Sequence, residues 1–144
     1  MDVVADLAAP CPVETLFEWV DDLGRYPDWL GIVERAELLA DGDGSPAWRV
    51  DLRGRLGPLA RSKRLRMVRT ERSDTGVTFE RRERDGRHHA PWILRADVAP
   101  SADGSVLTMR LHYGGALWGP VLERLLRDEI AASRARLLER VAGR

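Results

Sequence analysis

The sequence predicts an α+β domain in which a curved antiparallel sheet of about seven strands wraps around a long C-terminal helix. An apolar stripe at helical spacing runs from Trp118 to Val141, and strand-like segments separated by turn signals fill residues 32–113. A chain of 144 residues is long enough for one hydrophobic core but not for two. We therefore expect residues 1–144 to form a single domain.

The C-terminal helix is the element that the sheet is expected to surround. Charged residues, including Arg134, are expected mostly on the side away from the sheet. At about 1.5 Å per residue the helix would be roughly 35 Å long, so it needs a large apolar partner. Its apolar stripe comprises Trp118, Val121, Leu122, Leu125, Leu126, Ile130, Leu137, Leu138 and Val141.

The first 30 residues predict a short strand, one long helix and one short helix. Apolar residues alternate at positions 3, 5 and 7 and predict the strand. Pro12 suits the first turn of a helix whose apolar face continues to Leu23, and Gly24 ends it. Tyr26-Pro27-Asp28-Trp29-Leu30 predicts a tight turn or a second, short helix.

The central part of the chain reads as an antiparallel meander, with strands at 32–39, 47–53, 59–70, 77–84, 87–98 and 105–113. Asp85-Gly86 and Asp103-Gly104 predict two-residue hairpin loops, which fix the residues that face each other. The paired residues are mostly apolar, so one sheet face is apolar across three strands. These loops would pair Phe79 with Trp92, Val77 with Leu94, and Val98 with Met109.

Such a sheet has more apolar surface than one helix covers, and its twist would leave a cavity beside the helix. The segments Ala9–Leu30 and Leu111-His112-Tyr113-Gly114-Gly115 resemble the SRPBCC or START-domain superfamily, in particular its bacterial polyketide cyclase/dehydrase and lipid-transport branch. The resemblance extends over essentially the whole chain. It implies the helix-grip fold, with a pocket for a hydrophobic molecule such as a lipid or a polyketide-like compound.

We expect the ligand-binding residues on the inward face of the sheet. Aromatic side chains would line the pocket, and charged residues would form its polar rim. The same charged residues could instead be strand ends exposed to solvent, and the large aromatic residues could be plain core. The candidates are Trp48, Phe79, Arg81, Glu83, His88, Trp92, Tyr113 and Trp118, with Arg61 and Lys63 at the same end of the sheet.

An aromatase/cyclase is the alternative function. Arg81 or Arg61 could polarise a ketone oxygen, and Tyr113 or His88 could move a proton during an aldol-type ring closure. Cyclases of this class resemble that arrangement, with an arginine and a tyrosine in the pocket. Tyr113 is equally consistent with a core residue whose hydroxyl reaches the edge. The sequence therefore leaves binding and catalysis open.

A protein or RNA interaction module is the third interpretation, based on the basic run at residues 61–66. On a strand these charges alternate between the two faces, and Glu80 and Glu83 can neutralise them. Basic and acidic residues both number 23, so the chain has no net charge with which to attract nucleic acid. We expect no DNA binding and do not expect RNA binding.

We expect no cofactor and no metal site. His88 and His89 are adjacent and would point to opposite faces of a strand, and His112 would face outward. No apolar run approaches the roughly 20 residues of a membrane span. The first residues lack the layout of a secretion signal, and Cys11 has no cysteine partner, so we expect a cytoplasmic protein. The residue usage, with a single lysine and neither asparagine nor glutamine, indicates a GC-rich bacterial genome.

Overall fold

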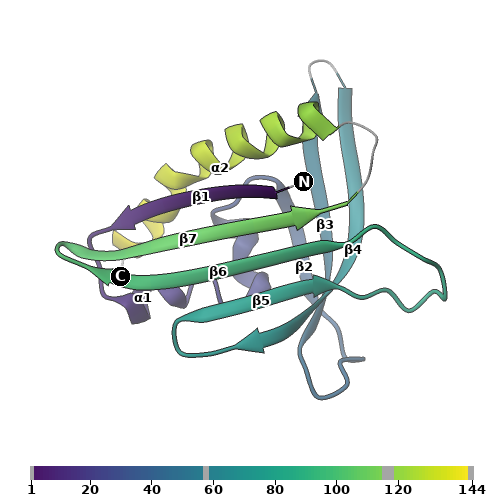
Figure 1. Cartoon of the computed structure of the whole chain (residues 1–144), viewed down its shortest axis with the longest axis horizontal. Coiled ribbons are helices and arrows are strands. Elements are labelled where there is room, and N and C mark those ends of the chain that lie inside the picture. The colour runs from purple at the N-terminus through teal and green to yellow at the C-terminus, as the bar shows by residue number, and fades with distance from the viewer. Residues whose placement is uncertain (1, 57–58, 115–118, 143–144) are drawn as a thin grey trace.

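The computed structural model describes residues 2–56, 59–114 and 119–142, and the side chains of residues 55–61 and 119–122 lie outside this description. In the described residues one strand is followed by two short helical segments, then by six strands and a long helix (Figure 1). The elements are β1 (Asp2–Ala9), α1 (Val13–Phe17), the 3-10 helix η1 (Leu23–Asp28), β2 (Val33–Leu38), β3 (Ala47–Leu56), β4 (Leu59–Arg72), β5 (Gly76–Arg81), β6 (Trp92–Ser101), β7 (Gly104–Tyr113) and α2 (Gly119–Ala142).

The seven strands of the described chain form one antiparallel sheet in the order β1-β7-β6-β5-β4-β3-β2. The first strand pairs with the last, β7, so β1 forms one edge of the sheet. Figure 1 shows α2 running along the sheet, and it contacts β1 near one edge and β3 near the other. The predicted fold class, a curved antiparallel sheet around a C-terminal helix, is confirmed.

The helix α2 buries one side against the sheet and begins and ends close to the predicted positions. From residue 123 onward its buried residues are Leu126, Ser133, Leu137 and Val141, at the spacing of one helical face. It approaches β3 closely at Gly54, where an added Cβ would lie 2.5 Å from the Leu125 side chain. None of the described helices is both long and apolar enough to cross a membrane.

The residues after η1 are fastened to the C-terminal half of α2. The Arg136 Nε donates a hydrogen bond to the Trp29 carbonyl at 3.1 Å. The buried Ser133 hydroxyl accepts one from the Gly31 N–H at 3.2 Å and donates one to the Glu129 carbonyl at 2.7 Å. These contacts hold η1 and its flanking residues over the space between α2 and the sheet.

The first helix is shorter than predicted. The sequence predicts one long helix from Pro12 to Leu23, whereas α1 spans Val13–Phe17 and is followed by turns before η1. The turn after α1 is set by tertiary contacts, because the Tyr26 hydroxyl donates to the Val20 carbonyl at 2.8 Å and the Trp29 indole donates to the Trp19 carbonyl at 3.0 Å. Those carbonyls are thereby used outside a continuous helix.

The two predicted hairpin registers are wrong by two residues. Val98 pairs with Leu107 and not with Met109, because the loop residues are Ala102 and Asp103 and Gly104 already pairs with Ser101. On the other hairpin the predicted two-residue loop does not form. The strands stop at residues 81 and 92, and the intervening segment is highly charged and ends in Pro91, which has no N–H for a ladder. The observed partners are Phe79 with Leu94 and Val77 with Ala96.

Candidate functional site

A cavity of about 80 Å³ lies between the concave face of the sheet and α2. The described residues that line it carry no charged side chain. Their polar side-chain groups are the Tyr26 hydroxyl and the Trp92 indole N–H. The lining comprises Val3, Leu23, Tyr26, Leu30, Ile32, Val33, Val50, Leu52, Leu65, Met67, Trp92, Leu94, Met109, Leu111, Leu126 and Ile130. We call this space the central cavity.

The Tyr26 hydroxyl has a structural role as a hydrogen-bond donor. It is fully buried and donates its hydrogen bond to the Val20 carbonyl at 2.8 Å. Burial raises the pKa of this hydroxyl far above its ordinary range, and the charges of Asp21 and Asp22 raise it further. Tyr26 therefore stays protonated at physiological pH and contributes its ring to the cavity wall and not an acid–base group.

Three aromatic candidates lie around the cavity and one lines it. Trp92 is in the lining, and Tyr113 stacks on it with ring centroids 5.3 Å apart. Phe79 is fully buried and packs edge-to-face against Trp48 at 5.5 Å and against Tyr26 at 6.1 Å. Phe79 and Trp48 thus form core on one side of the cavity, outside its described lining.

A charged cluster, which we call the polar end, sits beside the central cavity at the end of β5. The Arg81 Nε donates to the Glu83 carboxylate at 2.7 Å, and its Nη1 donates to the Ala90 carbonyl at 3.4 Å. The side chains of Arg81 and Glu83 are only 9% and 17% exposed, so this cluster differs from a frayed strand end. Lys63, which is exposed, is the third member of the polar end, because the charges of Arg81 and Glu83 both act on it.

The register places the polar end next to the cavity lining. Arg81 pairs with Met67 on β4, and Lys63 pairs with Leu52 on β3; Met67 and Leu52 both line the cavity. Burial lowers the pKa of Lys63, the charge of Arg81 lowers it further, and Glu83 acts in the opposite direction. Burial, followed by the charge of Glu123, raises the pKa of the Tyr113 hydroxyl.

The described lining of the cavity does not include the remaining candidates. His88 is exposed in the loop between β5 and β6, where the neighbouring His89 contacts the Asp85 carboxylate at 2.8 Å. The side chain of Arg61 and the whole of Trp118 lie outside the described residues. Among the residues that the structure describes, no group of three or more His, Cys, Asp or Glu side chains is arranged to hold a metal ion.

Sequence reasoning missed the contribution of the segment around η1. Leu23, Tyr26 and Leu30 line the cavity, although the sequence indicated only a helix end and a turn there. It also placed Arg134 on the outer side of α2, whereas Arg134, although exposed, borders a small pocket between α2 and β1. The spacing of Arg134 from Ile130 and Leu137, four and three residues away, was the available signal.

Comparisons with known proteins agree with this architecture. A family model described as "Polyketide cyclase / dehydrase and lipid transport" matches residues 2–142. A search of curated protein sequences found no match. The chain is similar in structure to a START superfamily protein from Mycobacterium smegmatis, with 17% identity, a TM-score of 0.74, and coverage of 99% of this chain and 97% of that one.

Two further solved structures share the fold. A protein of Thermus thermophilus is 20% identical with a TM-score of 0.77, and the match covers 99% of this chain and 98% of that one. The Zhui aromatase/cyclase from a Streptomyces species is 14% identical with a TM-score of 0.67, with 99% of this chain and 93% of that chain covered. Because the identities are this low, the structural matches establish the fold alone.

Proposed function

Because the chain belongs to the polyketide cyclase / dehydrase and lipid transport family, we propose that it binds a hydrophobic small molecule in the central cavity. The observation that carries the proposal is the chemistry of the described lining, which is aliphatic and aromatic and has no charged group. An apolar guest would lose contact with water there without leaving a buried charge unpaired. Tyr26 supports this, because its hydroxyl is already bonded to Val20.

The size of the cavity limits the ligand. At about 80 Å³ it is smaller than the roughly 150 Å³ engineered cavity that accommodates benzene. Met67 and Met109 are in the lining, and methionine side chains adjust readily to the shape of a guest. We therefore favour a slender aliphatic chain over a fused polycyclic compound, with the lining residues moving outward as the chain enters.

Cyclase chemistry is the second candidate, and the placement of Arg81 favours it. Its side chain is largely buried and its strand partner Met67 lines the cavity, so the guanidinium could reach a ketone oxygen at that end. Tyr113 is the proton-transfer candidate in this scheme. The test is turnover of a poly-β-ketone thioester, which Arg81→Ala and Tyr113→Phe should abolish; unchanged turnover in both variants would remove these roles.

The binding proposal is tested by native mass spectrometry of the purified protein, followed by organic extraction and identification of any bound compound. We expect a stoichiometric aliphatic compound, or saturable uptake of added 1-octanol. A protein that is empty and takes up no apolar probe would contradict the proposal.

A cavity-filling variant makes the same test specific for the site. Val50 lines the cavity, so Val50→Phe should place a ring inside it and reduce binding by at least about tenfold. Val4→Phe adds the same ring on the exposed side of β1 and should bind like the unmodified protein. If Val50→Phe does not fold, Leu111→Phe offers a second position in the lining. Equal binding by the filled and control variants would place the ligand elsewhere.

A further inference from the structure

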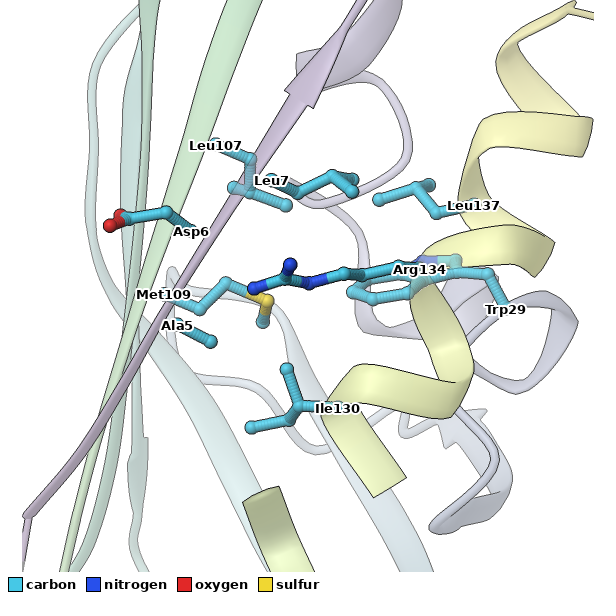
Figure 2. A pocket seen from close by; sticks show the side chains of 9 residues that line it. All are labelled: Ala5, Asp6, Leu7, Trp29, Leu107, Met109, Ile130, Arg134 and Leu137. Carbon is cyan, nitrogen blue, oxygen red and sulfur yellow. The ribbon is translucent and has the colours of Figure 1, made fainter. Parts of the chain in front are cut away.

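A second, smaller pocket opens between α2 and the edge strand β1. Its volume is about 20 Å³, and we call it the side slot (Figure 2). Its apolar walls include Leu7 on β1, Trp29 after η1, and Leu137 on α2. Arg134 is the basic residue at its border. A slot of this size holds little more than one water-sized group. It can therefore accept the end of a ligand and not a whole one.

The side slot and the central cavity share two wall residues. Met109 on β7 and Ile130 on α2 line both spaces, so these two side chains form the partition between them. Met109 is unbranched and can change rotamer at low cost. Rotation of that one side chain would join the slot to the cavity and give a path that an alkyl chain could occupy.

Arg134 borders this apolar slot without a counter-charge. The residue is exposed, and Figure 2 shows its guanidinium extending from α2 toward Met109. Asp6 on β1 points the other way and accepts a hydrogen bond from Thr108 at 2.8 Å. Within the described part of the chain, no residue accepts a hydrogen bond from Arg134 or pairs with it. Its neighbours one turn away on the helix are all apolar: Ile130, Ala131, Leu137 and Leu138.

Other arginines of α2 are already engaged. Arg127 donates to Glu123 at 3.0 Å, Arg136 donates to the Trp29 carbonyl at 3.1 Å, and Arg140 donates to the Asp28 carbonyl at 3.3 Å. Arg134 instead lies at the border of the slot, because its helix face is directed toward β1. A guanidinium there offers two parallel N–H donors to a carboxylate.

The geometry points to a single-chain carboxylate as the preferred ligand, with its head group bound by Arg134 at the side slot and its alkyl chain passing Met109 into the central cavity. This inference rests on the proposed function, because the chain occupies the same cavity. It adds the chemical class of the ligand, its direction, and the residue that selects it. A neutral alcohol of the same length would fill the cavity but leave Arg134 without an anion.

The test compares octanoate with 1-octanol at pH 8 by isothermal titration calorimetry. The proteins are the unmodified chain, Arg134→Met, Arg134→Lys, and the control Arg124→Met, which removes a charge from an exposed position of the same helix. We expect the unmodified protein to prefer octanoate by about tenfold. Arg134→Met should reduce this preference to within about twofold while 1-octanol binding persists, Arg134→Lys should retain part of it, and Arg124→Met should retain all of it.

The outcomes separate the two claims. Equal affinity of the unmodified protein for the two compounds, or an octanoate preference that survives Arg134→Met, would overturn the role of Arg134 and leave the proposed function standing. Loss of the preference in Arg124→Met as well would show a general effect of helix charge and overturn the inference. If the unmodified protein binds neither compound, the proposed function fails and this inference fails with it.

Discussion

The central cavity and the polar end lie beside each other on the concave side of one sheet, but their chemistry is opposite. The cavity is lined by uncharged side chains such as Leu65, whereas Lys63, two residues earlier on β4, belongs with Arg81 and Glu83. At the polar end, Arg81 and Glu83 satisfy each other at 2.7 Å. The difference teaches that a largely buried charge is tolerated in this fold where a residue two positions along the chain supplies the counter-charge, and that the middle is left for an apolar guest.

The largest expected effect separates core from cavity. Phe79 is fully buried against Trp48 and Tyr26, so Phe79→Ala should lower the free energy of unfolding by about 3–5 kcal/mol. Leu94→Ala removes its strand partner, which already borders the cavity, and should cost less. Urea unfolding of the two variants checks this order. A larger loss for Leu94→Ala would contradict the assignment of Phe79 to the packed core and of Leu94 to the cavity wall.

The next effect tests whether Arg81 and Glu83 stabilise each other at the polar end. Arg81→Met leaves the Glu83 carboxylate without its main partner and should cost about 2 kcal/mol in the free energy of unfolding. The double variant Arg81→Met, Glu83→Met should recover at least half of that loss, since no unpaired charge remains. A double-mutant cycle from urea unfolding measures the coupling. Strictly additive losses would show that the two side chains do not depend on each other.

A smaller effect concerns the attachment of the cavity wall to α2. The Ser133 hydroxyl is buried and accepts the hydrogen bond from the Gly31 N–H. Ser133→Ala should lower the free energy of unfolding by about 1 kcal/mol, because that N–H loses its acceptor. Hydrogen exchange should also become faster at residues 29–32. The control is Ala132→Ser, at an exposed position of the same helix. Unchanged hydrogen exchange at residues 29–32 in Ser133→Ala would argue against this attachment.

The smallest effect depends on pH and lies where the two regions meet. The folded protein binds the Lys63 proton less tightly than the unfolded chain, because burial and Arg81 lower its pKa from the ordinary 10.5. Stability should therefore rise as the pH rises toward 10.5, and Lys63→Met should remove that rise. The effect should stay under about 1 kcal/mol, since solvent screens the side chain.

The quantity to measure is the difference in the free energy of unfolding between the unmodified protein and Lys63→Met, taken at pH 7 and at pH 10. The titration of the tyrosines is common to both proteins and cancels in this difference. An identical pH dependence of the free energy of unfolding in the unmodified protein and Lys63→Met would show that Lys63 is not held near Arg81.

The strand pattern predicted the faces of the sheet better than it predicted the pairing. Both hairpin registers were wrong by two residues, and an even shift returns every side chain to the same face. Trp92 was therefore placed correctly toward the cavity, although the β6 partner of Phe79 is Leu94 and not Trp92. The α2 helix was predictable because apolar residues recur at helical spacing on both sides of Ser133, which takes the buried position between Ile130 and Leu137.

The missed features depend on contacts between distant parts of the chain. Tyr26 lines the cavity because its hydroxyl and the Trp29 indole bond to carbonyls of the turn after α1, which local propensity does not reveal. Arg134 was assigned to the outer side of α2 by its charge, but the edge strand β1 lies beside that part of the helix. When a helix is divided into an apolar inner side and a charged outer side, a residue at the boundary between them, such as Arg134, is assigned to the wrong side.

The most direct measurement of the central claim is a crystal structure of the protein equilibrated with xenon, which enters apolar cavities without needing a polar contact. We predict a xenon atom inside the central cavity, in contact with Leu65, Met67 and Trp92, and no such atom in Val50→Phe crystals. Xenon confined to the protein surface, with these side chains packed against one another, would contradict the account.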